Sequence, residues 1–481
     1  MADKKVVWKE VMRGFSIHTL LALALLQPLR AGDYPVSSYG AVGDGITLNT
    51  HAIQEAIDAS ALAGGGRVVI DSGRYLSGTL VMKSHVELHI GAGAVLLGST
   101  DPEHYPEMIT PYRFYGDEWV RQSLIFGYDL ENIALSGEGI IDGQGAAFQV
   151  NTKKKPDRYR NRPYLIRFTL CRGVRVSDLS LRNSAMWMQH YLACDDVSIT
   201  GIDVFNHCNK NNDMIDIDGC HRVVIKNCWG DTDDDALTLK STSPRACEDI
   251  RISDCVLSSH CNAIKMGTES TGGFKNIRIT NCVIKPSSVR EVIYGLPDGI
   301  SGISLEVVDG GLMEDIHISD VEMDGPEVPL FIRLGNRARP YVSGMDPPPV
   351  GRLGKVKISK IRASNAGTTG CSIAGIPGHR AGEILLENLD LEFRGGVEAG
   401  SFNDSVPELE ALYPEATMFG TLPASVLYLR HLEQIHISGV KAAFTRFDGR
   451  SHVVAEDVRD FSYRGLRMRD GKKLQVRINS K

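Results

Sequence analysis

A four-residue pattern recurs along most of the chain: a polar residue or glycine, an apolar residue, a variable residue and a second apolar residue. The repeat length is 22–27 residues in the central part and about 40 residues where loops intervene. One such unit cannot bury its own apolar side chains, but a stack of units can. Short strands at this period, without helices between them, predict a parallel β-helix. The copies lie at residues 132–135, 173–176, 196–199, 222–225, 249–252, 276–279, 315–318, 355–358 and 434–437.

One helix is expected before the repeat begins. Apolar residues between positions 52 and 59 follow helical spacing, and the glycines at 64–66 should end the helix. Such a helix would cover the open end of the sheet, where unpaired strand edges otherwise promote aggregation. The 49 glycines and the aromatic content of 7% suit many short strands and turns. No linker interrupts the repeat, so we predict one all-β domain over residues 32–481, a single-stranded parallel β-helix with an N-terminal capping helix.

The first 31 residues have the layout of a secretory signal peptide. Four basic residues between positions 4 and 13 precede an apolar stretch at residues 15–26, and a cut near Ala31 would follow. This stretch is too short for a transmembrane helix. The alternative is an N-terminal amphipathic helix. We predict a signal peptide over residues 1–31, a secreted or periplasmic protein, and no membrane association beyond the signal peptide.

The ten cysteines follow the repeat rather than the pattern of a disulfide framework. Cys228, Cys255 and Cys282 are each 27 residues apart, one repeat length. Cysteines at equivalent positions of stacked coils form a ladder of small buried side chains. We expect mostly free thiols, with one or two disulfides left open because neighbours in a ladder are close.

The charge of the chain narrows the expected partners. The net charge is −6 and the chain has no long basic run, so nucleic acid is not an expected partner. The charge is too small to identify a substrate.

Two acidic clusters, at residues 211–219 and 231–240, each run into alternating apolar residues. Aligning Ile215 with Leu237 places Asp213 opposite Asp235, on neighbouring strands about 4.8 Å apart. Asp234 lies one residue away. Crowded carboxylates raise one another's pKa, so that one can hold a proton while others stay charged. Hydrolysis of a glycosidic bond needs such a pair. The alternatives at this point are a solvated acidic rim and a calcium site.

Further motifs occur in a fixed order, and together they resemble glycoside hydrolase family 28, the polygalacturonase and rhamnogalacturonase family. The resemblance covers roughly residues 36–340. Its motifs are Tyr39–Gly45, Gly137–Gly145, Arg162–Ile166, Leu181–Trp187 with His190, Asn211–Asp213 and Asp234–Asp235.

The resemblance implies a right-handed β-helix and an inverting hydrolase that acts on pectin-type polysaccharide or oligosaccharide. Asp234 matches the general acid of the family, and Asp213 and Asp235 match the pair that holds and activates the attacking water. Inversion requires room for that water, with the acid and the base about 6.5–9.5 Å apart. The resemblance implies no metal and no cofactor. We expect a monomer with a galacturonan or rhamnogalacturonan-like substrate.

Two positions depart from the family pattern. Asn262 stands where the family has the histidine of a Gly-His-Gly motif, although His260 is close. Ser304 and Glu306 stand where the family has the arginine and lysine that grip a galacturonate carboxylate. Glu306 could accept hydrogen bonds from neutral hydroxyls instead. The expected substrate-binding residues are Asn211, His190, Lys240, His260, Asn262, Lys265 and Glu306.

Three outward-facing cations, Lys240, Lys265 and Arg333, could replace the missing pair. Lys265 is favoured because it lies one coil beyond the aspartates. A solvated surface charge is the alternative for each, above all for Arg333. Lys265 could also be a structural cation that pairs with Glu269 or another carboxylate.

Two functions of other classes stay open on the sequence. A β-helix lyase would bind calcium through the aspartates and use Lys or Arg to abstract a proton next to a uronate carboxyl group. A non-catalytic β-helix would only bind polysaccharide.

Overall fold

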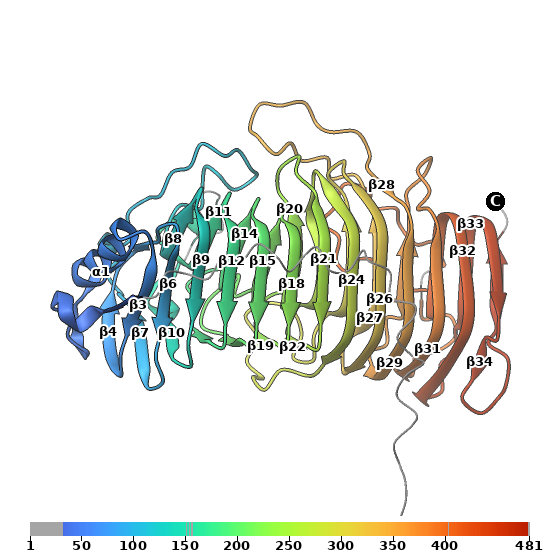
Figure 1. Cartoon of the computed structure of the whole chain (residues 1–481). Helices are drawn as coiled ribbons and strands as arrows, with labels where there is room; N and C mark the ends of the chain where they lie inside the picture. Colours follow the sequence, from blue (N-terminus) through green and yellow to red (C-terminus); the bar gives the residue numbers. More distant parts are fainter. Residues whose placement is uncertain (1–31, 151, 153, 155–156, 403, 480–481) are drawn as a thin grey trace, which may run out of the picture.

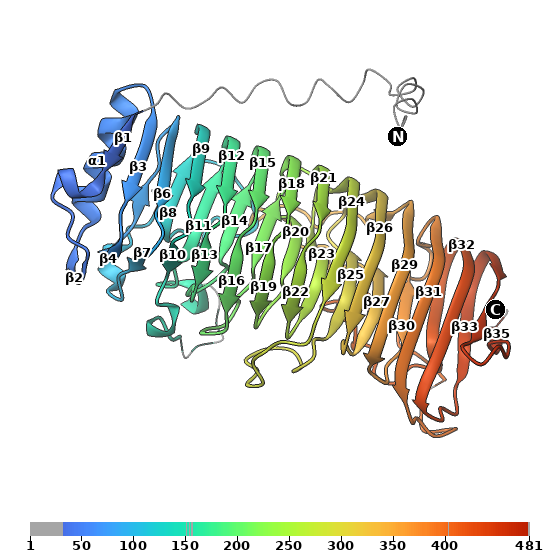
Figure 2. The ribbon, with the colours of Figure 1, turned by 60° about the horizontal axis from the view of Figure 1, so that its bottom comes forward.

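Each strand pairs in parallel with the equivalent strand of the next coil, and the coils stack along one axis (Figures 1 and 2). The computed structural model describes residues 32–150, 152, 154, 157–402 and 404–479. The predicted signal peptide, residues 1–31, lies outside this part. The described residues form a right-handed parallel β-helix, which confirms the predicted fold class.

The strands form three ladders, and the longest strands bend from one ladder into the next. The first ladder contains the sequence repeat. It consists of β1 (Asp33–Pro35), β3 (Gly66–Ile70), β6 (Val86–Ile90), β9 (Glu131–Ser136), β12 (Arg172–Ser177), β15 (Asp195–Thr200), β18 (His221–Lys226), β21 (Cys247–Ser253), β24 (Gly273–Ile284), β26 (Leu312–Asp324), β28 (Arg352–Leu353), β29 (Val356–Ala366), β31 (Ile384–Gly395), β32 (Ala424–Arg446) and β33 (Ser451–Arg464).

The second ladder lies on the next side of the coil and takes in the ends of the long strands. Its own strands are β2 (Asp44–Leu48), β4 (Gly73–Ser77), β7 (Ala94–Gly98), β10 (Ile140–Asp142), β13 (Ser180–Arg182), β16 (Asp203–Asn206), β19 (Trp229–Thr232), β22 (Val256–Ser259) and β34 (Arg467–Met468).

The third ladder carries both acidic clusters of the sequence. It consists of β5 (Leu80–Val81), β8 (Ser123–Tyr128), β11 (Tyr164–Thr169), β14 (Gln189–Leu192), β17 (Ile215–Asp218), β20 (Leu237–Ser241), β23 (Asn262–Ser270), β25 (Ser301–Val307), β27 (Val328–Leu334), β30 (Cys371–Ala374), β35 (Val476–Asn479) and the first parts of β32 and β33.

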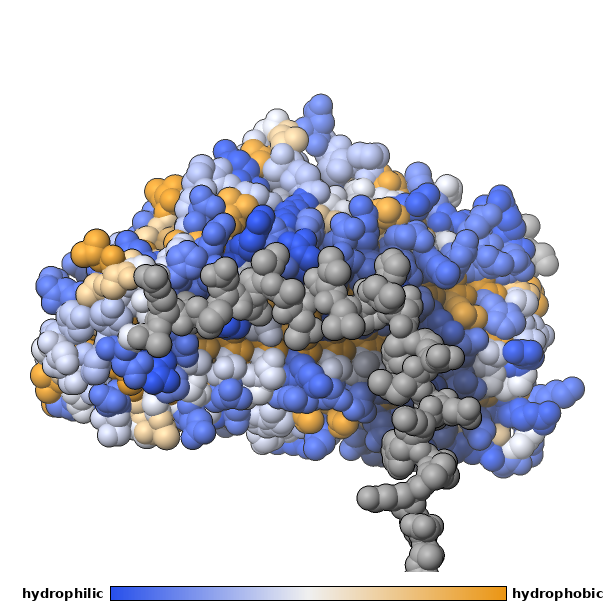
Figure 3. Space-filling model, in the orientation of Figure 1, coloured by the Kyte–Doolittle hydropathy of each residue, from blue (hydrophilic) through white to orange (hydrophobic). Residues whose placement is uncertain are grey.

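Apolar side chains at equal positions stack inside the coil. In the third ladder Ile215 pairs with Leu237, which pairs with Ile264, and the row continues to Ile303 and Leu330. All five are buried. The alignment of Ile215 with Leu237 is the one that the alternation predicts. Figure 3 shows mainly hydrophilic residues on the outer face in view, as expected when the apolar residues point inward.

A helix covers the N-terminal end of the stack, as predicted (Figures 1 and 2). Helix α1 (Thr50–Leu62) has Ile53, Ala56 and Ile57 on its buried face. None of the helices in the described ranges is long and apolar enough to cross a lipid bilayer. Within the described residues the remaining helical segments are short 3-10 turns: η2 (Val36–Tyr39), η3 (Pro102–His104), η4 (Gly145–Ala147) and η5 (Asp157–Tyr159).

Cys228, Cys255 and Cys282 occupy equivalent positions, because the residues that follow them pair in register across β19, β22 and β24. All three are buried, and all ten cysteines of the chain are free thiols. The cysteine ladder and the expectation of mostly free thiols are both confirmed.

The free state of the ten thiols can be tested directly. In guanidinium chloride without reductant, an Ellman titration should count all ten cysteines, because burial in the coil and not disulfide formation protects them. The same count after treatment with dithiothreitol is the control. A count of eight that rises to ten on reduction would show a disulfide and contradict the structure.

Candidate active site

Asp213 lies two residues before β17, and Asp234 and Asp235 lie three and two residues before β20. The two coils are joined at this point, since the amide of Met214 donates to the Asp235 carbonyl at 3.1 Å. The three carboxylates line one cavity of about 780 Å³. The structure therefore brings together the three residues that the sequence marks as catalytic.

The cavity lies over the third ladder, and five long loops build its walls. Each loop is an extension of a coil, which explains why the repeat is irregular at these places. The loops run over residues 99–122, 143–150 with 157–163, 285–300, 335–351 and 404–423. The aromatic residues of the lining are Phe114, Tyr115, Trp119, Tyr159, Tyr164, Trp187, Tyr294 and Tyr413.

Asp234 keeps partial exposure to the cavity. Burial raises the pKa of Asp234 to about 6, and the neighbouring Asp235 carboxylate adds to the rise. The amide of Asp235 donates to one oxygen at 2.9 Å, and the Asn211 side chain donates to the other at 3.4 Å. A carboxyl group with this pKa can hold a proton in weakly acidic solution and release it to a leaving oxygen.

Asp213 is 2% exposed, and one of its oxygens has no hydrogen-bond partner among the described residues. Burial raises its pKa well above the usual range, with contributions from Asp216 and Asp234. The ammonium of Lys240 opposes this effect, at 3.9 Å from Asp213 and 3.3 Å from Asp216. Burial also raises the pKa of Asp216 to about 8.

Asp235 is held from two sides. The Lys265 ammonium lies 3.0 Å from one oxygen, and the Asn262 side chain donates to the other at 2.7 Å. Asn262, at the position where the family pattern has histidine, thus contacts this carboxylate directly. Its backbone amide donates to the same oxygen at 3.2 Å.

Four of the seven expected substrate-binding residues line the cavity: Asn211, Lys240, Asn262 and Lys265. The others are buried outside its lining. His190 faces Asp218 at 3.1 Å, and burial lowers its pKa. Glu306 accepts a hydrogen bond from Ser304 at 2.7 Å, and burial raises the pKa of its carboxyl group to about 8.

His260 is also fully buried, and the next residue, Cys261, lines the cavity. Its two ring nitrogens lie 2.9 Å from Asp233 and 2.9 Å from the Val289 carbonyl. His260 therefore supports the loop at 285–300 instead of facing the cavity.

The expectation for Arg333 was wrong. Arg333 is neither a cavity cation nor a surface charge, because the loop at 404–423 covers it and leaves it 1% exposed. It donates to the Gly375 carbonyl at 2.8 Å and to the Glu408 carbonyl at 2.5 Å, and it lies over the Phe419 ring.

Lys265 is a paired cation, as one alternative held, but its partner is Asp235 and not Glu269. Its ammonium also lies 3.1 Å from the Tyr413 hydroxyl. Glu269 pairs with Arg339 at 3.0 Å instead.

The cavity contains residues that the repeat pattern could not indicate. Arg337 and Arg339 come from the loop at 335–351, and Tyr413 and Glu415 come from the loop at 404–423. Arg337 is half-buried and lies over the Tyr413 ring. The break in the repeat marks both loops in the sequence, but it does not show where their side chains point.

Comparison with known proteins gives a family and several relatives. The model of the family "Glycosyl hydrolases family 28" matches residues 67–404. A probable polygalacturonase of Vitis vinifera is 33% identical over 44% of this chain and 45% of its own length. An exo-poly-alpha-D-galacturonosidase of Dickeya chrysanthemi is 40% identical over 23% of this chain and 19% of its own length. The chain thus spans less than half of the length of these relatives.

Among solved structures, the exopolygalacturonase of Thermotoga maritima is 23% identical, with a TM-score of 0.62, over 75% of this chain and 87% of that chain. This likeness concerns the fold. The family match covers both acidic clusters and most of the third ladder, and on this ground the chain belongs to glycosyl hydrolases family 28.

Proposed function

We propose that the protein hydrolyses glycosidic bonds in pectin-type polysaccharides or oligosaccharides, with inversion at the anomeric carbon. The observation that carries this proposal is the pair of unlike carboxylates on the coil that leads into β20. Asp234 has a pKa raised to about 6, whereas Asp235 is held by Lys265 and Asn262. The family and the names of its relatives support the reaction class.

In the proposed reaction Asp234 gives its proton to the glycosidic oxygen, and the bond from that oxygen to the anomeric carbon breaks. A water molecule held by Asp213 and Asp235 attacks the same carbon from the opposite face. One water proton passes to this pair of carboxylates. The free oxygen of Asp213 gives the water an acceptor.

The charge of the lining supports an anionic sugar. Basic residues outnumber acidic residues on the cavity wall, which favours a uronate over a neutral sugar. The basic residues are Arg158, Arg162, Lys210, Lys240, Lys265, Arg337 and Arg339, and the acidic residues are Asp213, Asp234, Asp235, Glu269 and Glu415.

The calcium-dependent lyase is the weaker alternative. A calcium ion would need the oxygens of Asp213 and Asp235. The ammonium groups of Lys240 and Lys265 already lie beside these two carboxylates, at 3.9 Å and 3.0 Å. A divalent cation would have to displace both.

We further propose an exported monomer in which residues 32–481 form one catalytic domain after removal of a signal peptide. The layout of residues 1–31 supports export, and the unbroken repeat supports one domain. N-terminal sequencing and size-exclusion chromatography of the secreted protein test both points.

Asp234→Asn should lower kcat on the cleaved pectic substrate by about 10²–10⁴-fold, because the proton donor is lost. Asp213→Asn and Asp235→Asn should each lower kcat, and the double variant should lose less than the product of both, since they hold one water. Release of reducing ends is the assay. Asp320→Asn, which changes an exposed carboxylate of β26 paired with Lys360, is the control. Near-normal turnover in Asp234→Asn would exclude its role as the acid.

The kcat/KM profile should have a basic limb with an apparent pKa near 6, because Asp234 must be protonated to act. Above this pH the protonated fraction, and with it kcat/KM, should fall tenfold per pH unit. The residual activity of Asp234→Asn should lack this limb. A limb that is unchanged in Asp234→Asn would assign the titration to another group.

Arg337 and Lys265 should differ when each is replaced by Met. On a uronate substrate, Arg337→Met should lower kcat/KM by a factor that corresponds to about 1.5–3 kcal/mol, because the hydrogen bond from Arg337 to the uronate carboxylate is lost. On a neutral analogue the change should be small. Lys265→Met leaves Asp235 buried without its cation, so both substrates should suffer and stability should fall by about 3–5 kcal/mol.

Kinetics on both substrates, together with melting temperatures, make this comparison. If Arg337→Met lowered kcat/KM equally on charged and neutral substrates, Arg337 would not be the cation that binds the substrate carboxylate. Selective loss on the uronate in Lys265→Met, with unchanged stability, would return that role to Lys265.

A further inference from the structure

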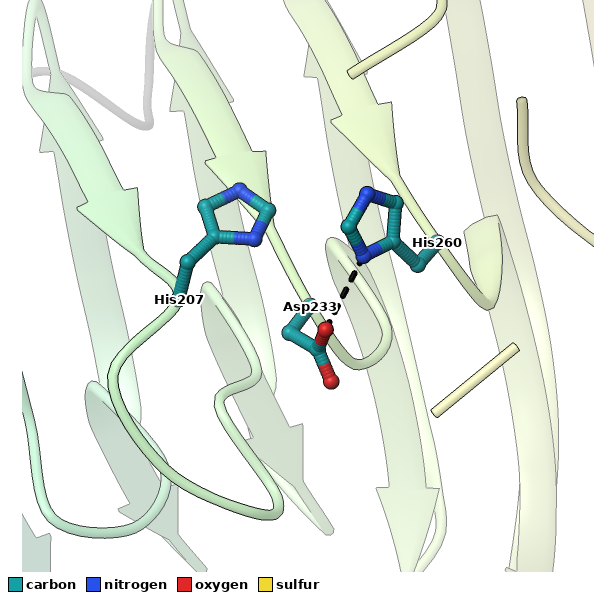
Figure 4. Close-up of side chains that lie close together, drawn as sticks. All are labelled: His207, Asp233 and His260. Atoms are coloured by element: carbon teal, nitrogen blue, oxygen red, sulfur yellow. Dashed lines mark hydrogen bonds and ion pairs between the residues drawn. The ribbon is translucent and has the colours of Figure 1, made fainter. Parts of the chain in front are cut away.

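His207, Asp233 and His260 form a second cluster of chemical groups (Figure 4), and none of the three lines the cavity. They follow β16, β19 and β22 on three successive coils, directly after the in-register residues Asn206, Thr232 and Ser259. The three side chains point toward one another, and each offers a ligand atom within 4.8 Å of the other two. Asp233 and His260 are fully buried, and the side chain of His207 is 5% exposed.

The outer nitrogen of each ring faces an acceptor. His207 Nε2 lies 2.9 Å from the Asp231 carboxylate, and His260 Nε2 lies 2.9 Å from the Val289 carbonyl. Both partners only accept hydrogen bonds, so Nε2 carries the hydrogen in both rings. Each ring therefore turns its Nδ1 toward the cluster.

The Nδ1 atom of His207 is buried and has no hydrogen-bond partner among the described residues. An orphaned acceptor of this kind costs free energy unless a ligand satisfies it. The Nδ1 atom of His260 faces the Asp233 carboxylate at 2.9 Å. The inner side of the cluster thus presents one free imidazole lone pair, one carboxylate and a second imidazole.

Metal-binding histidines typically donate their other ring N–H to a carboxylate or a backbone carbonyl, which fixes the tautomer. Both kinds of acceptor occur here: the Asp231 carboxylate beside His207 and the Val289 carbonyl beside His260. Two imidazoles and one carboxylate suit zinc and related divalent transition metals. The buried carboxylates of Asp231 and Asp233 would balance the charge of a dication. Zn–N bonds of about 2.0–2.1 Å require ligand atoms about 3.4 Å apart, so a small contraction of the cluster is needed.

We propose that His207 Nδ1, His260 Nδ1 and the Asp233 carboxylate bind a divalent transition-metal ion of the zinc type, with one position left to a water molecule. Binding forms three metal–protein bonds and releases to solvent any proton carried by His260 Nδ1. This site differs from the catalytic carboxylates and does not depend on the proposed hydrolysis.

The consequence of the site is structural, because the same carboxylates hold the loop at 285–300. Asp231 accepts hydrogen bonds from Ser287 and Ser288, and Asp233 accepts from the amides of Ile293 and Tyr294. Ile293 and Tyr294 in turn line the cavity. A bound metal would tie three coils and this wall of the cavity together.

The test uses the full mature chain without a polyhistidine tag, stripped with a chelator and titrated with Zn²⁺ by calorimetry. We expect one equivalent to bind at micromolar concentration and to raise the melting temperature. His207→Gln should weaken binding at least tenfold, and Asp231→Asn should weaken it about 10–100-fold, because Asp231 orients His207. His436→Gln is the matched control, since His436 is half-buried on β32, outside the cluster, and contacts Ser462. It should bind as the unmodified chain does.

X-ray absorption of the zinc-loaded, unmodified chain gives a measurement that does not depend on any variant. A first shell with two imidazoles and one carboxylate supports the site. A shell without imidazole, no binding at micromolar Zn²⁺, or unchanged affinity in a folded His207→Gln would each overturn the proposal. Circular dichroism establishes that the variants are folded.

Discussion

Parallel, in-register stacking of coils is the constraint on which the whole molecule depends. It sets residues at equal positions about 4.8 Å apart, whatever their chemistry. For Ile215 and Leu237 this proximity buries apolar surface and stabilises the stack. For Asp213 and Asp235 the same proximity concentrates negative charge, and burial together with this charge raises the pKa of Asp213 and Asp234. One geometric rule thus produces both the core and the unusual carboxylates.

The buried negative charge requires compensation, and two lysines of the third ladder supply much of it. Lys240 and Lys265 lie on β20 and β23, and their ammonium groups reach the carboxylates of Asp213 and Asp235. Removing one partner of such a buried pair is far more costly than the net contribution of the pair itself. Acids and lysines therefore form one electrostatic unit, in which a change at any member alters the proton affinity of the others.

Much of the scaffold could be predicted from the sequence, because period-2 alternation and a regular repeat fix register. The pairing of Ile215 with Leu237 and the cysteine ladder followed from spacing alone. Side chains whose surroundings are set by loops could not be placed. Arg333 occupies an outward strand position, yet a distant loop buries it. Arg337 reaches the cavity from a segment whose path no periodicity encodes.

The separation of a rigid ladder from five loops has a consequence for how such a protein can diversify. The ladder holds the reacting groups in place through strand pairing, whereas the loops contribute most of the cavity wall. Lengthening a surface loop costs little conformational free energy, about 0.6 kcal/mol for each doubling. Insertions and deletions in the loops can therefore change the depth and shape of the cavity, while the reacting groups on the ladder stay in place. Selection for a longer or shorter ligand would act on the loops and leave the register untouched.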